Sequence, residues 1–287
     1  MPSLGDFAEL VRAPAALSVP GDVVAGAAAA GALGRRVPGL AGASVLLYWA
    51  GMAANDWADR ELDAIERPER PIPSGRISPG TALGVSAGLT AAGLAVAGLT
   101  GGRRALAVAV PLAGAIWAYD VKAKNTAAGP AVMAACRGLD VLLGATGGKR
   151  PLRALPAAVT VAAHTYTVTE LSRREVSGAD RTLPKLTLAG TAAVAAAAVA
   201  GPRRTGWRGW IPAALTAWYV GQYGTAQARV AADPAADRVR AAVGAGIMGL
   251  PALQGALVAR TGAGMLGMAV AAAAPLGRRL ARKLSPT

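Results

Sequence analysis

Long runs without a charged residue constrain this chain more than any other feature. A run of about 20 apolar residues is long enough to cross the roughly 30 Å core of a bilayer. Backbone groups in lipid must bond internally, which allows only helices or a closed barrel. The runs here lack period-2 alternation and are rich in alanine, so they favour helices. They lie at 13–33, 40–54, 82–100, 105–119, 127–147, 155–168, 186–200, 210–228, 241–259 and 262–276.

The predicted fold is therefore an all-α, polytopic transmembrane helix bundle of nine, possibly ten, helices. Whether the last segment, 262–276, spans the membrane stays open because it is short. Apolar residues of the AVILMFWYC set make up 53% of the chain, and 37 glycines suit close helix–helix approach in a membrane.

The net charge of +14 does not indicate nucleic-acid binding. The 30 Lys and Arg residues occur mostly in short clusters between apolar segments, where they set topology and contact anionic lipid headgroups. We expect the lipid bilayer as a partner and no nucleic acid. A single cysteine, Cys136, and a single histidine, His164, exclude an internal disulfide and make a CxxC or histidine-based metal site untenable. Any metal should be held by carboxylates.

Six of the 16 acidic residues fall between positions 56 and 69. Asp56, Asp59 and Asp63 stand at i, i+3 and i+7, so on a helix they share one face. Carboxylates so placed repel one another unless a cation lies between them, and Mg²⁺, which usually binds together with substrate phosphates, is the natural candidate. The alternative is a solvated loop in which these carboxylates pair with the interleaved arginines. Those arginines are Arg60, Arg67 and Arg70.

The distribution of positive charge predicts the orientation. Loops on the side of the acidic stretch carry 18 Lys and Arg residues, against 11 on the other side. This bias places the acidic loop, about 55–78, in the cytoplasm of a cell-membrane protein. The second polar loop, about 170–185, and the turn at 122–124 face the same compartment. We expect one domain, 1–287, in which the acidic loop and the second polar loop cap an active site.

These loops carry a family pattern. The stretch Asn55, Asp56, Asp59 and Asp63 matches NDxxDxxxD, and residues 67–75 match RPxRPIPSG. Tyr119 precedes Lys122 by three residues after the fourth apolar segment. In these features the sequence resembles the UbiA superfamily of intramembrane prenyltransferases. The sequences of its loops are most similar to those of the EboC-like branch. The resemblance covers most of the chain.

The family's second motif, roughly DxxxDxxxG, is altered here. Glu170 stands at the first Asp position, Arg174 at the second and Gly178 at the glycine. An arginine in place of a metal ligand leaves open whether one or two Mg²⁺ ions bind, with Glu175 as a neighbouring substitute. Arg174 is instead expected to contact the diphosphate directly, because a guanidinium presents a fork to phosphate oxygens.

The resemblance implies Mg²⁺-dependent transfer of a prenyl group from a prenyl diphosphate to an acceptor within the membrane. The metal ligands that it implies are Asp56, Asp59, Asp63 and Glu170. The substrate-binding residues are Asn55, Arg67, Arg70, Tyr119, Lys122 and Arg174. For a proton acceptor, Asp63 and Glu175 are the candidates.

Ionisable residues inside apolar segments are costly and are usually functional or mutually paired. Asp22 lies in the first segment, and Arg137 and Asp140 lie in the fifth at i, i+3. Arg137 and Asp140 either form an intrahelical pair or bind a polar acceptor. The acceptor is unidentified, and these deep polar residues favour a polar one.

A second class of function fits the same scaffold. A non-catalytic polyprenyl-lipid binding or transport protein would keep the helices and lose the metal chemistry, and Arg174 motivates this alternative. An enzyme needs Asp56 and Asp59 together with Mg²⁺, whereas a binder should tolerate Asp56→Asn.

Overall fold

The computed structural model describes residues 2–200 and 207–273, and within these ranges the chain forms helices and no β-strand. Each of the ten predicted apolar segments contains at least one helix, which confirms the all-α fold class. The α-helices are α1 (Leu4–Leu10), α2 (Pro20–Ala29), α3 (Arg36–Ala58), α4 (Arg60–Glu66), α5 (Pro79–Val121), α6 (Gly129–Ala145), α7 (Leu155–Ser172), α8 (Leu183–Val199), α9 (Ile211–Tyr219), α10 (Thr225–Ala232), α11 (Ala236–Arg260) and α12 (Gly264–Ala271). Short 3₁₀ turns cover Ala13–Ser18, Ala123–Asn125, Pro151–Ala154 and Trp207–Trp210, and a π-helical turn at Val220–Gly224 joins α9 to α10.

The long element α5 is a pair of antiparallel helices. Gly102 interrupts it with φ 64° and ψ −154°, a left-handed conformation that glycine adopts without steric cost. The indole Nε1 of Trp117 then donates to Thr90 Oγ1 at 3.0 Å. In an unbroken helix these two residues would lie about 40 Å apart at 1.5 Å per residue. The predicted segments 82–100 and 105–119 are therefore the two arms of a helical hairpin.

Three helices of the described chain are long and apolar enough to cross a membrane: α3, α5 and α11. Helix α8 is apolar but shorter. Helix α12, the described part of the last predicted segment, has eight residues and packs on α11. That segment was predicted to end at residue 276, which lies outside the described residues.

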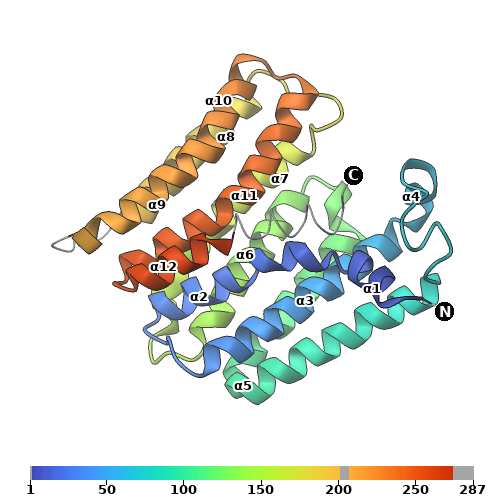
Figure 1. Cartoon of the computed structure of the whole chain (residues 1–287), viewed down its shortest axis with the longest axis horizontal. Helices are drawn as coiled ribbons and strands as arrows, with labels where there is room; N and C mark the ends of the chain where they lie inside the picture. Colours follow the sequence, from blue (N-terminus) through green and yellow to red (C-terminus); the bar gives the residue numbers. More distant parts are fainter. Residues whose placement is uncertain (1, 201–206, 274–287) are drawn as a thin grey trace.

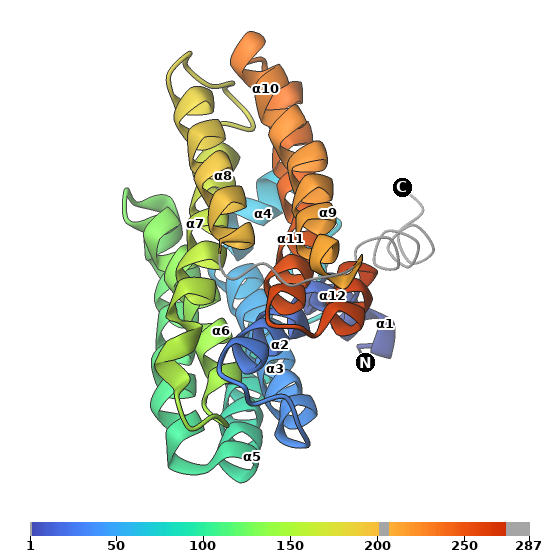
Figure 2. The same cartoon turned by 90° about the vertical axis from the view of Figure 1, so that its left-hand side faces the viewer.

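The helices are arranged around two apolar cores that share α2 and α6. One core joins α2 and α6 to α7, α8, α9 and α11, and the other joins them to α3 and α5. Figure 1 shows α3 and α5 together on one side, α8, α9 and α10 on the other, and α2, α6 and α11 between them. Figure 2 shows α9 and α10 running on as one continuous rod through the π-helical turn.

His164 is part of a buried polar contact between α7 and this rod. Its Nδ1 lies 2.9 Å from the hydroxyl of Tyr219, and Thr167 Oγ1 lies 3.1 Å from the hydroxyl of Tyr223. All of these side chains are buried, and the histidine ring packs edge-on against both tyrosines. The single histidine of the chain therefore holds two helices together.

Glycines allow α2 and α6 to touch through their backbones. A Cβ at Gly26 would clash with the carbonyl oxygen of Val141, and one at Gly144 would clash with the carbonyl oxygen of Val23. Small residues at such positions let membrane helices approach closely. Because α6 carries Arg137 and Asp140, this contact also sets the depth of those two residues in the bundle.

We predict that Gly144→Ala destabilises the protein by about 1–3 kcal/mol, the usual cost of adding a methyl group where there is no space. The matched control is Gly114→Ala, at an exposed helical glycine whose Cβ would meet no atom within 4 Å. Thermal unfolding in detergent measures both. An unchanged midpoint for Gly144→Ala, or an equal loss in the control, contradicts the close contact.

Candidate active site

The acidic stretch is a broken helix. Helix α3 ends at Ala58, Asp59 adopts φ −89° and ψ 3°, and α4 starts at Arg60. The backbone N–H of Asp59 still donates to Asn55, and that of Asp63 donates to Asp59, so the chain keeps a helical path through the break. Asp56 and Asp63 are 4% exposed.

Arg70 joins two of the three aspartates. Its Nη1 lies 2.6 Å from Asp63 Oδ2 and 3.3 Å from Asp56 Oδ1. Asp56 receives a second cation from the N-terminal segment, because Arg12 Nη2 lies 2.9 Å from the same Oδ1. The pairing of carboxylates with interleaved arginines that the sequence left open is thus present, through Arg70.

Asp59 has a different partner. Its Oδ2 lies 2.6 Å from Lys124 Nζ, in the turn between α5 and α6. Asp59 thus has a different cation partner from Asp56 and Asp63, while the backbone keeps its helical path through Asp59. That the three carboxylates share one face stays a prediction. We call Arg12, Arg70 and Lys124 with the three aspartates the ionic cluster.

The four predicted metal ligands do not converge. Glu170, on α7, lies within hydrogen-bonding reach of Tyr166. Among residues 2–200 and 207–273 no three Asp, Glu, His or Cys side chains lie close enough to hold a metal ion by themselves. Each aspartate of the ionic cluster is instead paired with a protein cation.

The second polar loop is tied to its neighbours. Arg173 Nη1 donates to the carbonyl of Thr126, and Arg240 Nη1 donates to the carbonyl of Glu175 at 2.9 Å. Burial raises the pKa of Glu175, against the opposing effect of Arg240 and Arg67. Arg67 of the acidic loop therefore lies near enough to act on a carboxylate of the second polar loop. Arg174 is exposed, as are Arg67 and Lys122.

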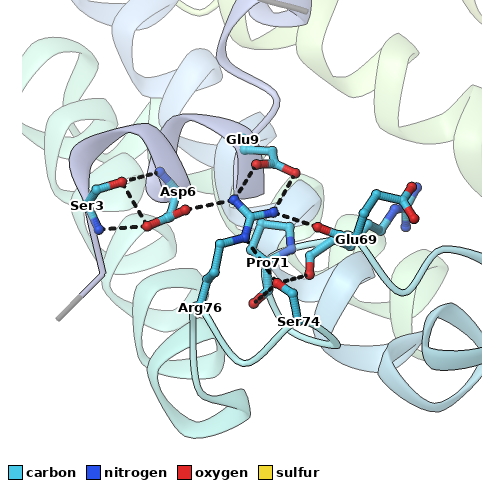
Figure 3. A network of polar contacts seen from close by, with 8 residues as sticks. Ser3, Asp6, Glu9, Glu69, Pro71, Ser74 and Arg76 are labelled. Atoms are coloured by element: carbon cyan, nitrogen blue, oxygen red, sulfur yellow. Dashed lines mark hydrogen bonds and ion pairs between the residues drawn. The ribbon is translucent and has the colours of Figure 1, made fainter. Parts of the chain in front are cut away.

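The N-terminal helix α1 is fastened to the acidic loop by Arg76. Its Nη1 lies 2.7 Å from both Asp6 and Glu9, and its Nη2 donates to the carbonyl of Glu69 (Figure 3). Ser3 caps α1 through a reciprocal pair of hydrogen bonds with Asp6. This attachment, which we call the N-terminal clamp, holds the segment that delivers Arg12 to Asp56.

A cavity of about 90 Å³ lies one to three helical turns before Asn55 along α3. Its polar lining includes the predicted Tyr119, Arg137 and Asp140 together with Asp120. The remaining lining residues are Val19, Ser44, Leu47, Tyr48, Gly51, Met52, Leu112, Ile116, Met133 and Cys136. Asn55 Nδ2 donates to Asp120 Oδ1 at 3.2 Å and so links the cavity to the ionic cluster.

At the inner end of the cavity, Arg137 and Asp140 have separate partners. Arg137 Nη2 lies 2.8 Å from Asp22 Oδ2 on α2, and Ser44 Oγ on α3 donates to Asp140 Oδ2 at 2.7 Å. Gln254 on α11 donates to the other oxygen of Asp22 at 2.7 Å. Both residues therefore contact partners on other helices. That they bind a polar acceptor stays a prediction.

Sequence reasoning missed Arg12, Lys124 and Asp120 as parts of this site. None of them belongs to the quoted family pattern, and their partners are 44, 65 and 65 residues away in the chain. The only sequence signal for these three residues was that acidic and basic groups alternate in the loops at one membrane face.

Together, these features define a helical membrane protein with an ionic cluster above a small, largely apolar cavity. Residues 18–172, more than half of the chain, match the model of the UbiA prenyltransferase family. The chain belongs to this family. The resemblance noted from the sequence is confirmed at family level, and nothing bears on the EboC-like branch.

Individual relatives match over shorter stretches. The digeranylgeranylglyceryl phosphate synthase of Methanothrix thermoacetophila is 56% identical over 57 residues, 20% of this chain and 21% of that protein. The bacteriochlorophyll synthase 33 kDa chain of Rhodobacter capsulatus is 43% identical over 70 residues, 24% of this chain and 23% of that protein. The chain thus covers about a fifth to a quarter of these curated relatives.

A solved structure shares the fold. It comes from work described as "Structural and mechanistic insights into the biosynthesis of Digeranylgeranylglyceryl phosphate synthase in membranes". The TM-score is 0.67 at 18% identity, covering 89% of this chain and 97% of that one. At this low sequence identity, the similarity shows only that the two chains share the arrangement of their helices.

The N-terminal clamp should respond to acid. Hydrogen bonds from Ser3 and the Arg76 guanidinium lower the pKa of Asp6 from 3.8 to about 2. Because the pKa of Asp6 is lower in the folded protein, the ionised carboxylate stabilises the clamp at pH values above the ordinary pKa of Asp6. This stabilisation is lost as the pH falls from about 4 through about 2. Hydrogen exchange in residues 7–11, corrected for intrinsic rates, should rise over that interval. A flat profile, or the same rise in Asp6→Asn, contradicts the role of Asp6.

Proposed function

We propose that this protein transfers a prenyl group from a prenyl diphosphate to a polar acceptor within the membrane, with Mg²⁺. One observation carries the proposal: three carboxylates, each held by a cation at 2.6 to 3.3 Å, are linked through Asn55 and Asp120 to a cavity between apolar helices. A prenyl diphosphate has the matching form, an anionic head on an apolar chain.

The ionic cluster can exchange partners when the diphosphate arrives. Arg12, Arg70 and Lys124 are the cations that the phosphate oxygens would attract, since guanidinium and ammonium groups are the usual phosphate donors. Moving them to the diphosphate releases the carboxylates of Asp56, Asp59 and Asp63. The predicted contacts with the diphosphate from Arg67, Lys122 and Arg174 would come from the protein surface, where these side chains are exposed.

The released carboxylates have the chemistry that Mg²⁺ prefers. This ion is commonly bound by one or two carboxylates plus substrate phosphates, so a preformed cluster of three acidic groups is not required. We assign Asp56 and Asp59 to the metal, with Asp63 as a further ligand. Glu170 stays a proposal for a second ion. Bound by these residues, the metal would supply positive charge that stabilises the departing diphosphate.

In the reaction, the bond between C1 of the prenyl group and the diphosphate oxygen breaks, and its electron pair leaves with the diphosphate. A nucleophilic atom of the acceptor bonds to C1 and releases a proton. Apolar lining residues such as Leu47, Leu112 and Ile116 keep water from the allylic cation. Of the two predicted proton acceptors, Asp63 is assigned to the metal, so Glu175, whose pKa burial raises, is the better base.

The names of the relatives support the reaction class and leave the acceptor open. One family member is named for a glyceryl phosphate product and another for bacteriochlorophyll synthesis. Both names are compatible with prenyl transfer to very different acceptors. We therefore propose a glyceryl phosphate lipid as one candidate acceptor.

A lipid binding or transport function remains the second candidate. The observation that favours it is that every aspartate of the ionic cluster is neutralised by a protein cation. The two functions differ in their need for Asp56 and for Mg²⁺.

The helical bundle places the protein in a membrane. We propose the cell membrane, with the acidic loop and the second polar loop on the cytoplasmic side, as the distribution of positive charge indicates.

Purified protein should convert labelled prenyl diphosphate into a labelled lipid when native membrane extract supplies the acceptor. Asp56→Asn should lower the rate by about 10²-fold or more, comparable to removing one electrostatic stabiliser of a transition state. Chelation of divalent ions should have the same effect. Glu61→Gln, at a side chain that is 86% exposed, is the matched control and should keep full activity. Metal-independent binding of prenyl diphosphate without product would support the lipid-binding alternative.

A further inference from the structure

One carboxylate oxygen of the cavity is accessible and has no partner. Asp120, at the end of α5, is 3% exposed and lines the cavity. Its Oδ1 accepts a hydrogen bond from Asn55 Nδ2 at 3.2 Å. Its Oδ2 accepts none in the described part of the chain, and it is not one of the inaccessible polar atoms that lack a partner, a set to which Asp140 Oδ1 belongs. Oδ2 of Asp120 therefore keeps accessible surface and can meet a molecule in the cavity.

Gly51 makes this position of Asp120 possible. Tyr48, Gly51 and Asn55 stand at i, i+3 and i+7, so they share one face of α3, and Tyr48 and Gly51 line the cavity. A Cβ at Gly51 would lie 3.1 Å from Asp120 Oδ2 and 2.7 Å from Ile116 Cγ2. The glycine thus leaves Oδ2 beside the wall of the cavity, and Asn55 on the same face of α3 fixes the other oxygen.

The other polar groups of the cavity are less suited to take a proton. Arg137 is a cation that is already paired with Asp22 at 2.8 Å. Asp140 Oδ2 accepts from Ser44, and its Oδ1 is inaccessible. The cavity is also lined by tyrosine and cysteine side chains, but ordinary phenols and thiols are mostly neutral at pH 7. Asp120 is therefore the group whose free oxygen can act as a base there.

The surroundings of Asp120 have opposing effects on its charge. Burial disfavours the ionised form, whereas the hydrogen bond from Asn55 and the cations Lys124 and Arg12 favour it; Asp59 disfavours it. Opposing effects of this kind suit a group that must both take and release a proton. The remaining titratable side chains within electrostatic range of this carboxylate are Tyr48, Tyr119 and Cys136.

We propose that Asp120 is the proton acceptor of the reaction. Neither Asp63 nor Glu175, the two candidates from the sequence, lines the cavity. The inference rests on the proposed function and gives its acceptor substrate a nucleophilic hydroxyl. As the hydroxyl oxygen bonds to C1 of the prenyl group, its proton passes to Asp120 Oδ2. The bond between C1 and the diphosphate oxygen breaks, and its electron pair leaves with the diphosphate. The protonated Asp120 then releases the proton to water.

Asp120→Asn tests this role, because the amide oxygen can still accept from Asn55 while the side chain no longer takes up a proton. Product formation from labelled prenyl diphosphate, with native membrane extract as the source of acceptor, should fall by about 10²- to 10⁴-fold, the usual contribution of a general base. Asp237→Asn, at an exposed side chain in the first turn of α11, is the matched control and should keep full activity.

A second readout separates proton transfer from cleavage of the diphosphate. Reversible cleavage exchanges isotopically labelled oxygen between the bridging and non-bridging positions of unreacted prenyl diphosphate, and it does not require removal of the acceptor's proton. Asp120→Asn should therefore keep this exchange near the wild-type rate while product formation is lost. A purely structural role of Asp120 would lower both rates together.

Asp120→Ala provides a second variant whose smaller side chain leaves space. Added formate, a small carboxylate, should restore its product formation several-fold and leave Asp120→Asn unchanged, because the amide fills that space. Wild-type turnover in Asp120→Asn, parallel loss of exchange and product, or no rescue by formate overturns the inference. A loss of product in Glu175→Gln alone would assign the proton to Glu175 instead. Failure of the proposed function is distinct: the wild-type protein would then neither form product nor exchange the label.

Discussion

Arg70 between Asp56 and Asp63 is the interaction on which the site depends. Two carboxylates that are 4% exposed cannot remain charged side by side in an apolar bundle without a cation between them. Arg70 supplies that cation from the acidic loop, Arg12 adds a second one from the N-terminal segment, and Lys124 neutralises Asp59 from the turn after α5. Three separate pieces of chain are thereby fixed at one end of the bundle. The same charges make the site responsive to a diphosphate, which competes for all three cations at once.

Below the ionic cluster, a second set of charges is arranged differently. The contact of α2 with α6, close enough to require Gly26 and Gly144, brings Asp22 against Arg137. That pairing is deep, and Gln254 reinforces it from α11. Asp140, on the same helix as Arg137, lines the cavity and accepts a hydrogen bond from Ser44. The upper set of charges is therefore suited to an anionic leaving group, and the lower set joins α2, α6 and α11.

Much of this architecture could be predicted from the sequence, because membrane helices require long apolar runs and the family pattern at 55–75 is long and ordered. The hairpin at Gly102 was also foreseen as two segments, 82–100 and 105–119, since Arg103 and Arg104 divide the apolar run there. The ion-pair partners of the aspartates were harder to predict. Arg12 lies 44 residues before Asp56, and no spacing rule connects a short N-terminal helix to the end of α3. The pairing of Asp59 with Lys124 joins residues on two different helical segments, and the i, i+3, i+7 spacing within one segment gave no information on it.

The most direct test of the account is the thermodynamic coupling between Mg²⁺ and the diphosphate. Mg²⁺ affinity would be measured by titration calorimetry with and without a non-reactive prenyl thiodiphosphate. If the cations of the ionic cluster move to the diphosphate and release the aspartates, each ligand should raise the affinity for the other by the same factor, about 5- to 150-fold for a typical coupling. Independent binding of the two ligands, or tight Mg²⁺ binding to the protein alone, would contradict the exchange of partners at Asp56, Asp59 and Asp63.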